Sequence, residues 1–268
     1  MSREEEPFLR LWCNYYCEEL GADNVYVLAE PGDETIGPAT ERHPGIHVMS
    51  TPAPQGLAFN ERWRTDTVWD WHHVLLTQHK AVIFADTDEF LIPSDGSTLR
   101  DYCDRFIESD APFIRGKGWN VVHDVDNEPA VEFVDGCHIL AQRNQMWEMP
   151  KMDKTLLTKQ PLSYSGGFHH VWESRSVGNR VPIEVSPELA ICHLQMFDLD
   201  VYLQRHHRRV ARMPPDPTYY KEIYTCGVRN MAKFYFQTKW CLWEQGSQLP
   251  WGFLPYEVPE HWKERLVY

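Results

Sequence analysis

The sequence predicts an α/β fold in which helices flank a mixed sheet. Residues 4–20 have the apolar spacing of an amphipathic helix and are followed by an apolar strand at 24–28. The same order returns later, with a helix at 60–77 followed by a strand at 81–85. Alternation of helix and strand is typical of parallel strands joined by crossover helices. The 268 residues, 43% of them hydrophobic and 24% charged, suffice for one such globular domain.

The first two elements have clear local signals. The apolar face of the first helix comprises Phe8, Leu9, Trp12, Tyr15, Tyr16 and Leu20. Gly21 is expected to end this helix, because glycine adopts the left-handed backbone of a helix C-cap at little cost. Residues 31–56 carry several prolines and glycines, so they are expected to be loops around a short strand at 47–49.

The rest of the chain is expected to be richer in strands. Ser97 is the predicted N-cap of a helix that reaches Glu108. Strands are predicted at 113–114, 119–123, 131–133 and 139–142, within a β-rich half of residues 111–195. The chain looks helical from Val201 onward, and the Pro- and Trp-rich tail 250–268 is expected to be irregular. Residues 1–210 are therefore interpreted as the main domain, and residues 211–268 as a helical and irregular extension of it.

Composition excludes some classes of function. The formal net charge of -13 argues against a general nucleic-acid binder, and the basic run 205–209 is expected to be a solvated helix face. The seven cysteines form no CxxC pair, which favours neither a disulfide framework nor a zinc ribbon. The N-terminus is too acidic for a signal peptide, and no apolar run approaches membrane-spanning length. We therefore expect a cytoplasmic protein without a transmembrane segment, and a peripheral membrane contact stays open.

The segment AVIFADTDEFLIP places three carboxylates at the end of an apolar strand. Asp86, Asp88 and Glu89 follow the strand at 81–85 within four positions. Strands of a parallel sheet end at the edge where ligands bind, and carboxylate oxygens are the ligands that Mg²⁺ and Mn²⁺ prefer. The alternative is that these acids cap a helix or lie in a solvated loop. The position after a buried strand leaves the two interpretations evenly balanced.

Three classes of enzyme use acids at such a strand end. A phosphatase of the haloacid-dehalogenase type needs Thr or Val at the fifth position of the motif, where this chain has Phe90. A nucleotidyltransferase would carry a Gly-rich loop near the N-terminus, and none is present. The third class is a nucleotide-sugar glycosyltransferase, in which a metal ion neutralises the diphosphate leaving group.

In four blocks, the sequence resembles the GT-A glycosyltransferases of the family 2 type, in the subgroup with a D-x-D-E-F motif. The blocks are EEEPFLRLWCNYYCEELGADNVYVL, AVIFADTDEFLIP, MDKTLLTKQPLSYSGGFHHV and LAICHLQMFDLDVYLQRHHRR, which together span most of residues 4–210. The DTDEF block is the most specific of them. The resemblance implies a GT-A fold, a Mn²⁺ or Mg²⁺ cofactor, a nucleotide-sugar donor (a UDP-sugar above all) and a glycan or small-molecule acceptor.

The resemblance also implies roles for individual residues. Asp86 would contact the donor ribose or the metal, and Asp88 would be the principal metal ligand. Glu89 would make a hydrogen bond behind them. His169 or His193 would complete the metal shell, with His170 as the alternate, although a structural histidine is the commoner fate of such a residue. Lys154 would hold the donor diphosphate, and its alternative is a solvated lysine.

Transfer with inversion needs a base to take the acceptor proton. Glu148 and Asp153 are the first candidates and Asp135 the third, and nothing in their spacing separates them. Members of this family carry an apolar strand ahead of the first helix, and Met1–Arg3 are too few for one. An alternative function is therefore a non-catalytic carbohydrate-binding or glycan-assembly protein with a degenerate GT-A fold.

Overall fold

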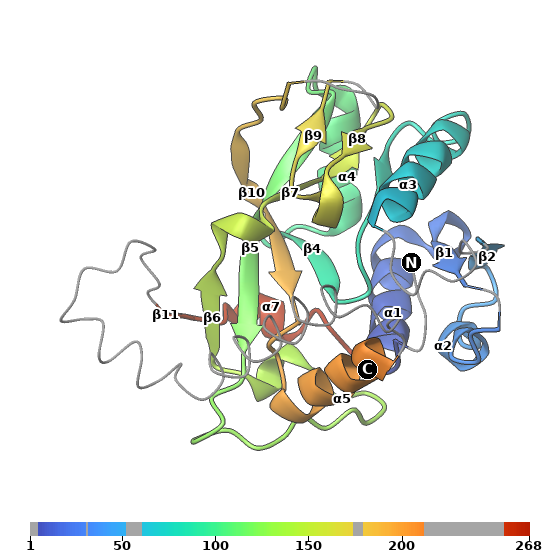
Figure 1. Cartoon of the computed structure of the whole chain (residues 1–268). Coiled ribbons are helices and arrows are strands. Elements are labelled where there is room, and N and C mark those ends of the chain that lie inside the picture. Colours follow the sequence, from blue (N-terminus) through green and yellow to red (C-terminus); the bar gives the residue numbers. More distant parts are fainter. Residues whose placement is uncertain (1–4, 31, 52–60, 174–178, 212–254) are drawn as a thin grey trace. The chain divides into compact units, whose positions relative to one another are not determined.

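The computed structural model describes residues 5–30, 32–51, 61–173, 179–211 and 255–268 (Figure 1). The chain divides into two compact units. The first comprises Met1–Pro54, Asn60–Gly118 and Met149–Cys192, and the second comprises Gln55–Phe59, Trp119–Glu148 and His193–Tyr268. The fold is α/β with strands in both parallel and antiparallel pairs. Within the described part of the chain, no helix is both long and apolar enough to cross a membrane.

The first unit begins with a helix packed on a pair of parallel strands. The elements are α1 (Phe8–Leu20), η1 (Ala22–Asn24), β1 (Tyr26–Ala29), α2 (Ile36–Thr40) and β2 (His47–Ser50). Leu9 and Cys13 of α1 pack with Val27 of β1 in one buried cluster. Gly21 ends α1 with φ of 82°, and its N–H donates to the Cys17 carbonyl. The predicted first helix, its glycine stop and the two strands that follow it are confirmed.

The acidic segment lies between two short strands that follow the next helix. The elements are α3 (Glu61–Leu75), β3 (Val82–Ile83), β4 (Glu89–Pro93) and α4 (Leu99–Glu108). The predicted strand at 81–85 is therefore shorter than expected, and β4 was not predicted. Helix α4 is confirmed, but its N-cap is Thr98, whose hydroxyl accepts from the Asp101 N–H, and not Ser97. Ser97 instead bonds the Asp95 carboxylate.

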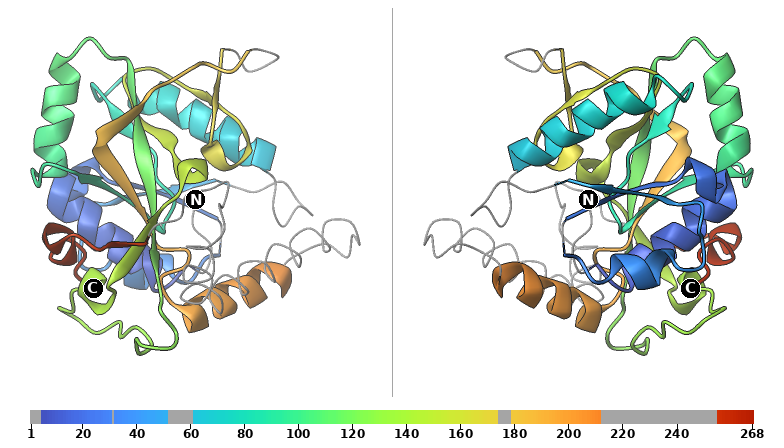
Figure 2. Two further views of the ribbon diagram at one scale, coloured as in Figure 1. Left: turned by 90° about the vertical axis from the view of Figure 1, so that its left-hand side faces the viewer. Right: turned by 90° about the vertical axis from the view of Figure 1, so that its right-hand side faces the viewer.

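Three further strands build the sheet around β3 and β4, namely the first part of β5 (Phe113–Val122), β7 (Lys154–Thr158) and most of β10 (Val185–His193). Strands β8 (Ser163–Tyr164) and β9 (Val171–Trp172) pair with each other in a separate two-stranded sheet. The short helices η3 (Pro150–Met152) and η4 (Gly166–Phe168) lie between these strands in the sequence. In strand order, β3 pairs with β7, β7 with β5, β5 with β10 and β10 with β4 (Figure 2). A Cβ at Gly116 of β5 would lie 2.9 Å from Ile191 of β10, so glycine is what allows these strands to pack closely.

The second unit packs a helix against a small antiparallel sheet. Its elements are the end of β5, η2 (Leu140–Gln142), β6 (Gln145–Glu148), α5 (Leu199–Ala211), β11 (Pro255–Glu257) and α7 (Glu260–Lys263). Strand β6 pairs with β5 on one side and β11 on the other. Val122, Trp147, Met196 and Tyr202 form its buried core. The basic run 205–209 lies on α5.

Three predictions for this part of the chain are wrong. Residues 131–133 form no strand, and residues 139–142 form the 3₁₀ turn η2 instead of a strand. The end of the tail is not irregular, because β11 and α7 lie there and Trp262 and Leu266 are buried. The helix predicted from Val201 is confirmed as far as Ala211, and residues 212–254 lie outside the described part.

Candidate functional site

The three acids lie on a tight turn that joins β3 to β4. The Glu89 N–H donates to the Asp86 carbonyl at 3.0 Å, which closes a β-turn over Asp86–Glu89. We refer to these four residues as the acidic turn. Strand β3 has already ended at Ile83, so the acids are delivered by the turn and not by the strand itself. Glu89 has no exposed surface, and Asp88 is buried with 8% exposure.

Helix α1 fixes the strand that leaves the acidic turn. The Tyr16 hydroxyl donates to the Glu89 carbonyl at 3.1 Å and accepts from the Leu91 N–H at 3.2 Å. The Tyr15 hydroxyl donates to the Leu91 carbonyl at 2.6 Å. These two phenols therefore satisfy backbone groups on the edge of β4 that no neighbouring strand pairs among the described residues. Sequence analysis placed both tyrosines on the buried helix face but gave no sign of this role.

Two cations lie against the acids. Arg64 of α3 donates from Nη2 to Asp86 Oδ1 at 2.8 Å. Lys154 of β7 contacts both Glu89 Oε1 and, at 3.4 Å, Asp86 Oδ2. Lys154 is 3% exposed, so the alternative of a solvated lysine is wrong. The structure thus brings together Asp86 and Lys154, two of the residues singled out from the sequence, as an ion pair.

The cations and the burial act on the acids in opposite directions. Burial alone would raise the pKa of Asp86, but the charges of Arg64 and Lys154 lower it to about 2. Burial raises the pKa of Glu89 to about 7, against the lowering effect of Lys154. Burial would lower the pKa of Lys154, and the Glu89 and Asp86 carboxylates raise it instead. Asp86 is therefore an anion at neutral pH, whereas the pKa of Glu89 lies close to neutral pH.

The segment GGFHH reaches this cluster through Phe168. The Arg64 guanidinium lies over the Phe168 ring, with Cζ 5.3 Å from the ring centroid, while it bonds Asp86. Phe168 also packs on Phe84, and it adopts a φ of 61°, which is strained for a bulky residue. His169, the next residue, is half-buried at the end of η4.

The other predicted site residues of the first unit have structural contacts. The Asp153 carboxylate accepts from the Gly118 N–H at 2.8 Å, which fastens the loop before β7 to β5. The His170 N–H donates to the Ser165 hydroxyl, and burial together with Arg180 and Arg115 lowers the pKa of His170. The Asp153 carboxylate is therefore held in place by the Gly118 N–H. This contact is compatible with a structural role for Asp153 and equally with its role as a catalytic base.

Three predicted site residues belong to the second unit. His193 Nδ1 lies 2.5 Å from Asn120 Oδ1, so the imidazole donates from Nδ1 to the amide oxygen. A hydrogen bond from one ring nitrogen to an oxygen is what orients a histidine whose other nitrogen binds a metal ion. Glu148 is half-buried on β6, opposite Trp119 of β5, and the third candidate base, Asp135, is exposed.

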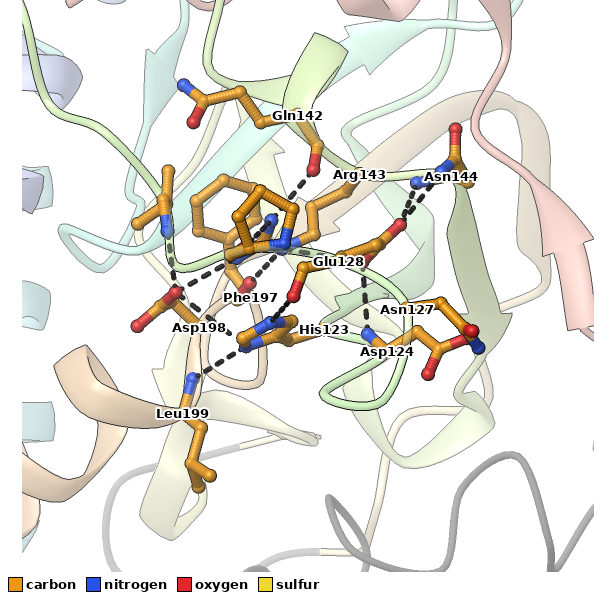
Figure 3. A network of polar contacts seen from close by, with 12 residues as sticks. His123, Asp124, Asn127, Glu128, Gln142, Arg143, Asn144, Phe197, Asp198 and Leu199 are labelled. Carbon is orange, nitrogen blue, oxygen red and sulfur yellow. Dashed lines mark hydrogen bonds and ion pairs between the residues drawn. The ribbon is translucent and has the colours of Figure 1, made fainter.

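The second unit also contains a buried polar cluster that the sequence did not indicate (Figure 3). Arg143 has no exposed surface and donates to the carbonyls of Phe197, Pro129 and Gln142 and to Asp198 Oδ2. Asp198 in turn accepts from the Val201 N–H at 3.0 Å and caps α5. This cluster ties the loops before η2 and β6 to the start of α5, and its role is structural.

Arg64 is the main residue of the site that sequence reasoning missed. Its helix was predicted, but α3 carries charged and aromatic residues on several faces, so no periodicity marks the face that is turned inward.

Within the described residues, no group of three or more His, Cys, Asp and Glu is arranged to hold a metal ion. Among protein-family models, curated proteins and solved structures, none matches this chain.

Proposed function

We propose that this protein is a metal-dependent glycosyltransferase with a GT-A type of fold. It would move a sugar from a nucleotide-sugar donor, with a UDP-sugar as the first choice, to a glycan or small acceptor, with inversion. The observation that carries the proposal is the acidic turn between β3 and β4, which presents Asp86 as an anion at neutral pH close in sequence to the buried Asp88. The resemblance of the DTDEF segment to that class of enzyme gives the turn its chemical interpretation.

The donor atoms of the acidic turn suit a Mn²⁺ or Mg²⁺ ion. Both metals prefer hard oxygen ligands and keep positions for water and phosphate oxygens, so two carboxylates suffice as protein ligands. Asp88 would hold the ion together with Asp86. When bound, the metal would neutralise the charge that develops on the diphosphate leaving group.

The remaining charges of the site give the chain's own residues their roles. Arg64 and Lys154 contact Asp86 and keep it ionised. A guanidinium and an ammonium are also the groups that bind diphosphate oxygens, so either could exchange its carboxylate partner for the donor. Glu148 and Asp153 stay the candidates for the base that takes the acceptor proton.

The test is a thermal-shift comparison with UDP and Mn²⁺ together, UDP alone and Mn²⁺ alone. We expect stabilisation that needs both components, of about 2.7 kcal/mol when the free ligand is a hundred times its Kd. Asp88→Asn should abolish the shift, and Asp110→Asn, at an exposed position, should keep it. The proposal fails if the unaltered protein shows no metal-dependent shift. If the shift is observed, a screen of nucleotide sugars for slow donor hydrolysis would identify the sugar.

A second candidate is a non-catalytic carbohydrate-binding or glycan-assembly protein with a degenerate GT-A fold. The pairing of Asp86 with two cations favours it, because a carboxylate neutralised within the protein needs no metal. This candidate predicts glycan binding that is unaffected by EDTA and by Asp88→Asn. Donor hydrolysis that EDTA stops would exclude it.

A further inference from the structure

Strands β8 and β9 form a small sheet in the first unit, and one side of this sheet carries a row of polar and aromatic side chains (Figure 1). Trp172 of β9 is in register with Ser163 of β8 and, on its other edge, with Arg180. Residues in register on adjacent strands lie on the same side of a sheet, so these three side chains form a row across it. The preceding pair, Tyr164 and Val171, is buried, so the row lies on the outer side.

Two members of this row are open to a ligand. Trp172 is 37% exposed, and Arg180 is exposed as well. Within the described part of the chain, Arg180 forms no ion pair. An exposed indole offers a flat apolar face on which a ring can stack, and a guanidinium offers a planar fork of donors to an oxyanion. The row therefore combines a stacking surface with a cation.

A second guanidinium lies close to Arg180. Arg115 of β5 donates from Nη1 to the Ile183 carbonyl at 3.4 Å and from Nη2 to the Asp153 carbonyl at 3.3 Å. Ile183 follows Arg180 by only three residues, so the first bond joins Arg115 to the segment that carries Arg180. Burial lowers the pKa of Arg115, the Asp153 carboxylate raises it, and the charge of Arg180 lowers it again. Two guanidinium groups thus interact here with one carboxylate, which leaves a net positive charge.

Two buried nitrogen atoms of this cluster have no hydrogen-bond partner. Among the residues that the structure describes, this holds for Arg115 Nε and for His170 Nδ1. His170 precedes Trp172 by two residues, and alternation along the strand places it on the same side as Trp172. Because buried polar groups in proteins are normally hydrogen-bonded, two such atoms beside unpaired cations indicate a place for a polar ligand.

The cluster is separate from the ion pairs of the acidic turn. Arg115 is in register with Thr155 of β7, whereas Lys154 is in register with Gly116. Successive residues of a strand point to opposite sides, so Arg115 and Lys154 project from opposite sides of the β5–β7 pair. A ligand held by Arg115 therefore does not need the cation that contacts Asp86 and Glu89.

We propose that Trp172, Arg180 and Arg115 bind a sugar residue that carries an acidic group, either a phosphate or a uronic carboxylate. The indole stacks on the apolar face of the sugar ring, and the guanidinium groups bind the oxygens of the acidic group. The choice of a sugar as the ring rests on the proposed function, whereas the choice of an anion rests on the charges of this cluster. The site would thus make an acidic glycan the preferred acceptor.

The test labels the full chain with 5-fluorotryptophan and follows the Trp172 signal by fluorine NMR. Trp172→Phe lacks this signal and so assigns it. The ligands are glucose 6-phosphate, glucuronate, glucose, inorganic phosphate and UMP. We expect an acidic sugar to shift the Trp172 signal in a saturable way, and the tighter of the two acidic sugars identifies the acidic group. Glucose should bind at least about tenfold more weakly, because it lacks the charge that the arginines bind.

Two arginine variants separate this site from general effects of charge. Arg180→Gln should weaken the binding of the acidic sugar about tenfold, because it removes a charged donor. Arg180 is exposed, so this variant should fold like the unaltered protein. Arg62→Gln, on the exposed face of α3, removes the same charge elsewhere in the first unit and should leave binding unchanged.

Several results would overturn the proposal. It is wrong if neither acidic sugar shifts the Trp172 signal, if glucose binds equally well, or if Arg180→Gln binds like the unaltered protein. Inorganic phosphate that binds as tightly as glucose 6-phosphate would show an adventitious ion only. Tighter binding of UMP than of either acidic sugar would assign the site to a nucleotide. The titrations contain neither UDP nor a metal ion, so their failure would leave the thermal-shift test of the glycosyltransferase unaffected.

Discussion

The buried carboxyl group of Glu89 should make the stability of the protein fall as pH rises toward neutral. The pKa of Glu89 is about 7 in the folded chain, against an ordinary value of 4.5. Between these values the folded state holds a proton that the unfolded state has lost, so the free energy of unfolding decreases with rising pH. At about 1.4 kcal/mol for each pH unit, the interval corresponds to about 3 kcal/mol. Glu89→Gln mimics the protonated form and should remove this decrease.

The assay is urea unfolding of the protein and of Glu89→Gln from pH 4.5 to pH 8. We expect the variant to gain about 3 kcal/mol relative to the unaltered protein across that range, whatever its absolute stability at low pH. Glu108→Gln, at the exposed end of α4, is the control and should follow the unaltered protein. Parallel profiles for the protein and Glu89→Gln would refute the reasoning, because Glu89 would then titrate alike in both states.

Substitutions at three further positions test the packing around the sites by urea unfolding. Arg143→Met should cost about 3–5 kcal/mol, because it leaves Asp198 buried without its cation, and Arg143→Lys should rescue little since lysine lacks the planar fork. A cost below 1 kcal/mol would contradict the role of this cluster. Tyr16→Phe should cost about 1–3 kcal/mol by leaving backbone groups of β4 unsatisfied, and an unchanged midpoint would show that water replaces the hydroxyl. Gly118→Ala should cost about 1–3 kcal/mol, because its Cβ would lie 2.6 Å from the Met152 backbone, and a neutral result would mean that this loop yields.

Helices were predictable where the signal is local. The apolar spacing and Gly21 define α1, and the capping hydroxyl of α4 was misplaced by only one residue. The strand predicted at 131–133 failed because side chains take the backbone groups that a neighbouring strand would use. The Val131 N–H donates to Asp198, and the Glu132 N–H and carbonyl both bond the Gln142 amide. Such partners lie 10 to 67 residues away, so β-propensity cannot reveal them.

The acids of the candidate site were predictable, and their cations were only partly so. Asp86 and Asp88 are separated by one residue in the sequence and follow an apolar run, which is a local pattern. Arg64 was missed because Arg62, two residues earlier on the same helix, looks equivalent in the sequence. Arg62 instead pairs with Asp66 on the exposed face. Which arginine faces inward depends on the packing of α3 on Phe168, and that contact comes from a segment about a hundred residues away.

The charge balance of the acidic turn limits how any ligand can bind there. Asp86 already has a cation on each carboxylate oxygen, so an incoming metal ion would compete with Arg64 and Lys154 for it or use Asp88 instead. Lys154 is held by Glu89 as well as by Asp86, and Arg64 stacks on Phe168 as well as bonding Asp86. A guanidinium or ammonium that gives up Asp86 to a metal would in turn suit a diphosphate. A metal ion and a nucleotide-sugar donor should accordingly bind more strongly together than either alone. The metal ion would pair with the Asp86 carboxylate, and the donor diphosphate would pair with the cation that the metal ion displaces.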